Sequence, residues 1–376
     1  MGNAEAKPTG RHKGSKHGNV TETVDKRVEQ AFVRLAGSTS NSLTFGDLKG
    51  IFGESVAESL WNFLSDSKPY DAKLSFQEFS QHAVSLMGTS TDVYIMAFQP
   101  LLHLIKVCSE AAGAGAVAGD EQFIANLAKE MSASGSNAHA IITWKNAICP
   151  KFCHALQERI LQECLGLNFP VTDYSSDILT PIQMWYVRCS LPSKYSVTGT
   201  STKVNIATAT QGISVNRFEA NVFDYRGPTV TIFQLTDKSI FVLATEETWR
   251  HGSSRFGGPD TMLFQIAPKL ERRESSSSIY CNFKIRSAAF GLSFEDVLKI
   301  NKDMDNVEAA EVWGCASSNA LEDQQKLRAW QNKQAEKHKK VPLPGNWDDN
   351  PDKTLLEMAG FQFSDEKRRM ELDARQ

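Results

Sequence analysis

The sequence of 376 residues lacks the patterns of several large protein classes. Its seven cysteines are odd in number and include no CxxC pair, which argues against a disulfide framework or a zinc ribbon and favours a reducing, cytosolic compartment. Its most apolar stretch, 93–107, is interrupted by polar residues and a proline, so it is too short and too polar to cross a bilayer. Positions 1–20 lack the apolar core of a secretory signal. Any association with a membrane is therefore expected to be from one side.

Sequence motifs of nucleotide binding and hydrolysis are absent as well. There is no P-loop, GxSxG or HExxH motif, and the glycine-rich stretch 252–258 is interpreted as a turn because no Lys-Ser or Lys-Thr pair follows it. Cys149, Cys153 and His154 lie close in the sequence, but Pro150 separates the cysteines and no fourth ligand is evident. Core packing is the favoured interpretation of these residues. We therefore expect no enzymatic activity, no metal site and no cofactor.

The net charge is −3, so no strong positive field is present to attract nucleic acid, and we expect no nucleic-acid partner. Basic residues gather in two places, the first of which follows Gly2. Removal of Met1 would expose Gly2 for N-myristoylation, although Ala6 stands where Ser or Thr is usual. An acyl chain together with a basic patch supplies the two signals needed for stable attachment to an anionic membrane surface. We predict that residues 1–20 are a disordered, membrane-binding segment, with an unmodified, solvated tail as the alternative; its basic side chains are Lys7, Arg11, Lys13 and Lys16.

Residues 21–166 show the apolar periodicity of helices and are predicted to form a helical domain. Helix–loop–helix spacing resembles a pair of EF-hands, whose loops would join through a short β-bridge at Leu43 and Leu74. With Leu74 at the eighth loop position, Glu78 takes the twelfth, where calcium needs a carboxylate. The first loop has Asp47 at its twelfth position and few other oxygen ligands for calcium. We therefore predict an EF-hand-like domain that has lost tight calcium binding. The remaining calcium-ligand positions of the second loop are held by Ser67, Pro69 and Asp71, and Ala72 replaces the required glycine.

The spacing of apolar residues changes after residue 165, where short apolar and β-branched runs alternate with turns. One amphipathic helix is predicted over 215–223, and residues 236–238 suit a hairpin joint. Sequential short strands with few helices predict an antiparallel β-sandwich over 175–318. The chain as a whole is predicted to be α+β, with a helical N-terminal domain, a β-sandwich flanked by helices and a C-terminal helix. The strands are predicted at 203–210, 228–235, 239–244, 261–267, 279–285, 288–294 and 310–315.

The second basic cluster lies at 321–340, where six Lys or Arg face three acids. We predict a helix there, within a C-terminal helical tail over 321–376, with Leu327 and Trp330 on one side. Basic amphipathic helices bind membrane surfaces, calmodulin-like proteins or a groove on another protein. The alternative is a solvated helix that folds on the β-rich domain of its own chain.

Several short motifs over 176–314 resemble the TLDc family in their order and spacing. They include the Gly-Pro strand start, the tryptophan step at 247–249, the Phe-Gly-Leu motif at 290–292 and the closing Glu-Val-Trp-Gly motif. The chain departs from the family at 242–243, where Val-Leu replaces Gly-Gly, and in the shorter segment 268–287. The residues that carry the resemblance are Gly227, Pro228, Trp249, Phe290, Gly291, Glu311, Trp313 and Gly314.

The combination of an N-terminal glycine, an EF-hand-like region, a TLDc domain and a charged helical tail resembles the lysosomal, mTOR-associated branch of this family. The resemblance implies binding to the vacuolar-type proton ATPase, a role in oxidative-stress resistance and no chemical reaction. We accordingly predict a membrane-associated regulatory protein, cytoplasmic and peripheral on lysosomal or vacuolar membranes. Two alternatives stay open: a redox-active antioxidant enzyme, for which Cys189 beside Arg188 is the candidate thiol, and a calcium sensor.

Overall fold

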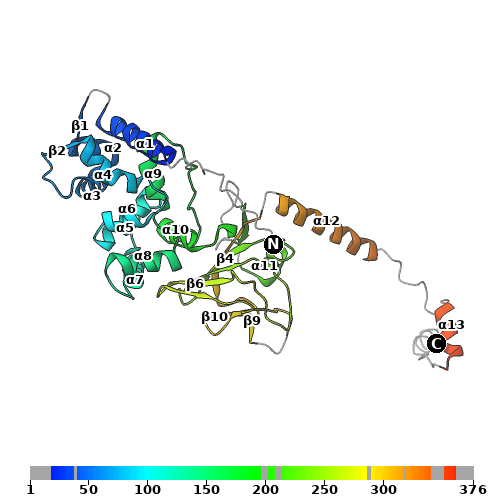
Figure 1. The fold of residues 1–376 in the computed structure, drawn as a ribbon. Helices are drawn as coiled ribbons and strands as arrows, with labels where there is room; N and C mark the ends of the chain where they lie inside the picture. The colour runs from blue at the N-terminus through cyan, green and yellow to red at the C-terminus, as the bar shows by residue number, and fades with distance from the viewer. Residues whose placement is uncertain are drawn as a thin grey trace, which may run out of the picture. The chain divides into compact units, whose positions relative to one another are not determined.

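A computed structural model describes residues 18–37, 40–195, 202–207, 213–285, 289–316, 319–339 and 351–360. The fold is α+β, as predicted, with helices first, antiparallel sheets second and further helices at the C-terminal end (Figure 1). The chain divides into a compact unit of residues 1–320 and a second unit of residues 321–376. Within the described ranges, no helix is long and apolar enough to cross a membrane.

Helices fill the first half of the larger unit, and several of them begin at a side chain that caps the first turn. The Asn137 side chain accepts a hydrogen bond from the Ala140 N–H at 2.8 Å and so begins α8. Helix α1 ends at Ala36, before Gly37, whose φ of 83° is one that glycine adopts readily. The helices are α1 (Gly18–Ala36), α2 (Phe45–Phe52), α3 (Glu54–Leu64), α4 (Phe76–Leu86), α5 (Asp92–Ala97), α6 (Leu101–Ala111), α7 (Glu121–Met131), α8 (Ala138–Ile148), α9 (His154–Leu165) and α10 (Pro181–Ser190).

Two very short strands, β1 (Ser42–Thr44) and β2 (Lys73–Ser75), join the first two helix–loop–helix segments. They pair antiparallel with Leu43 opposite Leu74, so the predicted β-bridge is confirmed. Both leucines are fully buried. Each strand leads directly into a helix through a capping box, formed by Thr44 and Asp47 in the first and by Ser75 and Glu78 in the second.

The second half of the larger unit is built on two antiparallel sheets. The larger sheet has the order β3-β11-β4-β5-β6-β7 and the smaller has the order β10-β9-β8. The β4–β5 hairpin turns at the predicted joint, where Lys238 has a φ of 69°. The elements are β3 (Thr202–Ala207), α11 (Val215–Val222), β4 (Thr229–Leu235), β5 (Ile240–Thr245), β6 (Met262–Ala267), β7 (Glu271–Glu274), β8 (Ile279–Cys281), β9 (Phe290–Phe294), β10 (Leu298–Asn301) and β11 (Val307–Gly314).

One predicted strand is much shorter than expected. The apolar run 279–285 predicts a strand throughout, but β8 ends at Cys281. There the Gly252 N–H donates to the Cys281 carbonyl oxygen at 3.1 Å, and the Asn282 N–H donates to the Gly291 carbonyl oxygen at 2.7 Å. The bond to Gly291 is the last contact with β9, and the bond from Gly252 joins the end of β8 to the segment after β5.

The large sheet is covered on both faces. Side chains alternate along a strand, so Phe233 and Leu243 face the small sheet and α11, whereas Ile232 and Val242 face α10 and the helical half. Figure 1 shows α10 between the other helices and the large sheet. The Tyr186 ring of α10 contacts the rings of Phe123 in α7 and Phe264 in β6, with centroids 5.8 Å and 6.3 Å away.

Candidate interaction site

Most of the predicted motif residues meet at one end of the large sheet. The Trp249 indole N–H donates to the Thr229 hydroxyl at 2.9 Å, and the Cys315 N–H donates to the Pro228 carbonyl oxygen at 2.8 Å. Trp249 is 2% exposed, and Trp313 is also buried. These contacts fasten the start of β4 to the end of β11 and to the segment after β5. The motif side chains therefore hold the sheet together.

The three motif glycines lie where the chain approaches itself closely. Gly227 has a φ of 155°, and an added Cβ would lie 2.4 Å from the Cβ of Ala316. A Cβ at Gly314 would lie 2.5 Å from the Tyr225 hydroxyl oxygen, which accepts the Ala316 N–H at 3.0 Å. A Cβ at Gly291 would meet the Lys302 Cα at 3.0 Å. Glycine is required at these positions for packing.

Glu311 connects the first and last motifs of the predicted domain. Its carboxylate is buried and accepts hydrogen bonds from the Ser176 hydroxyl at 2.6 Å and the Asp177 N–H at 2.9 Å. The Ser176 oxygen in turn accepts the Leu179 N–H at 3.0 Å. The carboxylate of the closing motif thus fixes the turn that leads into α10. Phe290 lies apart from this group, on the small sheet, and is 37% exposed.

The second helix–loop–helix segment, for which an EF-hand-like loop was predicted, holds a lysine beside the carboxylate that calcium would need. One oxygen of Glu78 pairs with the Lys68 ammonium group, and the other accepts from the Ser75 N–H at 3.0 Å and hydroxyl at 2.9 Å. The ammonium group is the largest cause that lowers the pKa of Glu78 to about 2. Within the described ranges, no three His, Cys, Asp or Glu residues are grouped to hold a metal ion. The contact between Lys68 and Glu78 was not predicted from the sequence. The feature that could have indicated it is a lysine at the second position of the predicted loop.

Substitution of Lys68 by glutamine is expected to make stability less sensitive to acid. Because Glu78 has a pKa below its ordinary value of 4.5, its contribution is present above pH 4.5 and is lost as the pH falls toward 2. Removing Lys68 raises the pKa of Glu78, so stability falls less steeply as the pH is lowered. Thermal unfolding at pH values between 2 and 5 would measure the slope, with Lys73→Gln as the matched control. Equal slopes in the wild type and Lys68→Gln would contradict the assignment.

The cysteines do not offer a reactive thiolate. All seven are buried and free of disulfides. Burial raises the pKa of Cys164 to about 12 and that of Cys315 to about 11, and it also raises the pKa of Cys189 well above the ordinary value. Arg188, whose proximity in sequence made Cys189 a candidate, donates instead to the Asp173 carbonyl oxygen at 2.9 Å. This environment favours the unreactive thiol form.

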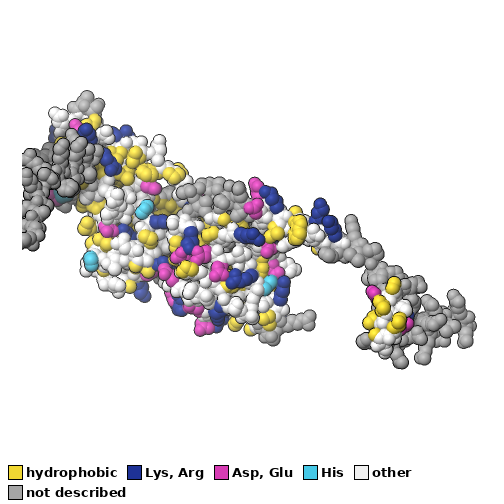
Figure 2. All heavy atoms as spheres, turned by 45° about the vertical axis from the view of Figure 1, so that its right-hand side comes forward, with side chains coloured by type: hydrophobic (Ala, Val, Ile, Leu, Met, Phe, Trp, Pro, Cys, Tyr) yellow, Lys and Arg dark blue, Asp and Glu magenta, His cyan; other side chains and the backbone are white. Residues whose placement is uncertain are grey.

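A surface cleft of about 300 Å³ lies between α6, α9 and the segment 169–174. Its lining includes Glu158, whose pKa is raised by burial, and the ring of Tyr174. None of the motif residues named above lines this cleft. On the face drawn in Figure 2, acidic and basic side chains are interspersed over the larger unit and form no patch of one sign.

The C-terminal unit presents apolar side chains to solvent. Its helices are α12 (Asn319–Lys339), close to the predicted bounds, and α13 (Pro351–Met358). Trp330 is 59% exposed and Met358 is 82% exposed, whereas Leu327 is half-buried. Helix α12 is more polar around its circumference than the predicted amphipathic helix, because apolar residues in it are few. Trp330 and the exposed side chains of α13 are therefore the apolar candidates for a partner surface.

The proposed membrane-binding residues lie outside the described ranges. These residues are Gly2, Lys7, Arg11, Lys13 and Lys16.

Comparison with known proteins identifies one domain. Residues 172–329 match the model of the TLDc domain, so the predicted presence of this domain is confirmed. Three curated fungal proteins named "Restriction of telomere capping protein 5" are similar to parts of the chain. The protein of Colletotrichum graminicola is 41% identical over 232 residues, covering 40% of this chain and 38% of its own length. Those of Pyrenophora tritici-repentis and Leptosphaeria maculans are each 39% identical over 64 residues, covering 17% of this chain and 10% of their own lengths. The chain therefore spans well under half the length of these relatives.

Proposed function

We propose that this protein is a non-enzymatic regulator that acts by binding at the cytosolic face of lysosomal or vacuolar membranes. An acylated Gly2 and the basic residues after it attach the chain to the membrane, and the C-terminal helix α12 binds the vacuolar-type proton ATPase. The TLDc domain supports a regulatory role, and the resemblance to the mTOR-associated branch supplies the candidate partner, the link to mTOR signalling and the link to oxidative-stress resistance.

The observation that carries the binding function is the exposure of Trp330 on a helix outside the larger unit. A large aromatic side chain in water is energetically unfavourable unless a partner covers it, and tryptophan is enriched among the residues that dominate protein interfaces. Leu355 and Met358 of α13, a separate helix, are 64% and 82% exposed. These two side chains have the i, i+3 spacing that a helix seated in a partner's groove uses.

Catalysis is disfavoured by where the motif residues lie. Trp249, Glu311 and Trp313 are buried and bonded within the fold, so substitutions there would act on stability. The burial of the cysteines, and the raised pKa of the candidate thiol Cys189, argue against the antioxidant enzyme. The Lys68–Glu78 pair argues against the calcium sensor. A calmodulin-like protein is the second candidate partner, because it also binds basic helices with apolar anchors.

Replacing Trp330 by alanine is expected to weaken capture of the partner by about 30-fold, the loss expected for one aromatic anchor worth about 2 kcal/mol. The tagged protein would be purified from gently solubilised membranes with and without calcium, and the captured proteins would be quantified by mass spectrometry. Gln331→Ala, on the same helix, is the matched control and should retain the partner.

Enrichment of proton-ATPase subunits by the wild type and by Gln331→Ala, but not by Trp330→Ala, is the expected result. In the same preparation, Gly2→Ala should move the protein from the membrane fraction to the soluble fraction. Capture of a calmodulin-like protein only with calcium would replace the proposed partner. Equal capture by all variants would overturn the assignment of α12.

A further inference from the structure

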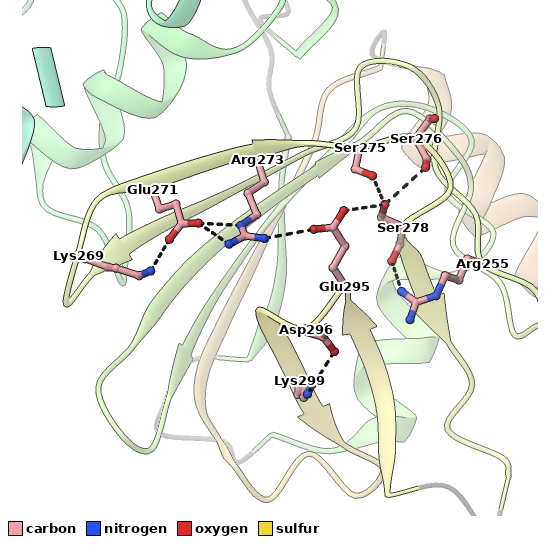
Figure 3. Close-up of polar contacts among 10 residues, drawn as sticks. All are labelled: Arg255, Lys269, Glu271, Arg273, Ser275, Ser276, Ser278, Glu295, Asp296 and Lys299. Atoms are coloured by element: carbon pink, nitrogen blue, oxygen red, sulfur yellow. Dashed lines mark hydrogen bonds and ion pairs between the residues drawn. The ribbon is translucent and has the colours of Figure 1, made fainter. Parts of the chain in front are cut away.

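The turn between β7 and β8 holds four consecutive serines, which follow Glu274 and lie close after two arginines of β7. Figure 3 shows three of these serines beside Arg273 and Arg255. Strand β7 (Glu271–Glu274) is the last strand in the order of the large sheet, so its outer edge has no strand partner in the described part of the chain. The backbone groups of an open sheet edge are accessible to an extended segment of another protein. The serines of the turn are Ser275, Ser276, Ser277 and Ser278.

The two arginines point to opposite faces of β7, as alternation along a strand requires. The Arg272 side chain is 8% exposed and donates to the Ala147 carbonyl oxygen of α8 at 3.2 Å. The Arg273 side chain is 43% exposed and lies on the other face, where it pairs with Glu271 at 2.6 Å and Glu295 at 3.5 Å. Arg273 is therefore the arginine that an incoming protein can reach.

The four serines differ in what their surroundings allow. Ser278 is 5% exposed, and its hydroxyl bonds to Ser275. Ser277 is exposed but has a φ of 57°, which bends the backbone away from the extended form. Ser276 is exposed, precedes that bend and follows Arg273 by three residues. Ser276, in the turn just after β7, alone among the four combines an exposed side chain with an accessible arginine three positions before it.

The neighbourhood of the turn is already arranged to hold a negative group. The Glu295 carboxylate lies between the Arg273 guanidinium and the Ser278 hydroxyl, at 3.5 Å and 3.4 Å (Figure 3). On the other side of the turn, Arg255 donates to the Ser278 carbonyl oxygen at 2.9 Å. Two guanidinium groups thus flank the serines, and arginine is the side chain that best binds a phosphate dianion.

We propose that Ser276 is a phosphorylation site for a serine kinase that selects arginine three residues before the acceptor. The γ-phosphoryl group of ATP is transferred: the bond between the serine Oγ and phosphorus forms, the bond between that phosphorus and ADP breaks, and the serine proton passes to the kinase's carboxylate base. The dianion competes with Glu295 for Arg273 and adds negative charge beside the open edge of β7.

The test uses the folded full chain, ATP and the catalytic subunit of an arginine-directed serine kinase. Tandem mass spectrometry should map one phosphoryl group to Ser276. Ser276→Ala should abolish incorporation, whereas Ser275→Ala should not. Arg273→Gln should lower the initial rate by about tenfold or more, the loss of one charge-assisted contact. Lys269→Gln, on the same hairpin, is the matched control and should react like the wild type.

Circular dichroism of each variant would first establish that it is folded. Incorporation at Ser253, which also follows an arginine by three residues, would overturn the proposal. So would equal rates for Arg273→Gln and the wild type, or incorporation only after denaturation. Phosphorus NMR of the product tests the second part: the phosphate pKa should rise when Arg273 or Arg255 is replaced by glutamine. A phosphate that titrates identically in all three proteins would show that the arginines do not bind it.

Discussion

Replacing Trp249 by alanine is expected to destabilise the larger unit by about 3–5 kcal/mol, the range for removing a large aromatic side chain from a core. The indole is 2% exposed and packs edge-to-face on Phe218, with ring centroids 5.5 Å apart. It also contacts the ring of Phe256 at 6.1 Å and donates to Thr229. The substitution would leave a cavity between the sheets and an unpaired hydroxyl at the start of β4. Urea unfolding followed by circular dichroism would measure the free energy.

Trp249→Phe separates the two contributions. Phenylalanine keeps most of the ring packing on Phe218 and loses the indole N–H, so the expected cost is about 1–2 kcal/mol. If phenylalanine cost as much as alanine, the hydrogen bond to Thr229 would be the dominant contribution. Ring packing would then be the minor one.

Glu311→Ala is expected to cost about 3–4 kcal/mol, because two donors lose a charged acceptor inside the protein. The Ser176 hydroxyl and the Asp177 N–H are held at 2.6 Å and 2.9 Å by this carboxylate. Without it, the turn before α10 loses its anchor on β11. The same urea experiment would report the loss, and proteolysis at 172–180 should accelerate.

Glu308→Ala is the matched control, on the same strand. Glu308 pairs with Lys238 at 2.7 Å, but both side chains reach solvent, so the expected cost is below about 1 kcal/mol. Similar costs for Glu308→Ala and Glu311→Ala would mean that the buried contacts at Ser176 contribute little to stability.

Strong periodicity made much of the fold predictable. Apolar periodicity over 21–166 predicted helices, because one face of a helix such as α3 or α4 is buried and the other is solvated. Helix α10 was not predicted because eight of its ten residues are buried, which removes the alternation of polar and apolar faces. Strand β7 was not predicted because its sequence, Glu-Arg-Arg-Glu, has no apolar residue; it pairs through its backbone with β6.

The motif residues were predictable in position but not in role. Their order along the chain indicates the domain, but the sequence does not show that Glu311 reaches back to Ser176, 135 residues earlier. The sequence also does not show that Lys68 lies against Glu78. Alignment with a calcium-binding loop assigns roles to the ligand positions only, and the second position, held by Lys68, is not one of them. Such contacts arise from the tertiary fold.

The helical half and the TLDc half share one apolar core. Residues of α7, α8 and α9 belong to the same buried cluster as α10 and one face of the large sheet. Buried Asp120 accepts from the Thr180 hydroxyl at 2.7 Å, and the Asn126 amide donates to the Pro268 carbonyl oxygen at 3.1 Å. Separation of the halves would expose the apolar side chains of this shared core to water. Neither half can therefore unfold without destabilising the other. The larger unit should consequently melt as one cooperative species, and a fragment cut between α9 and α10 would be prone to aggregate.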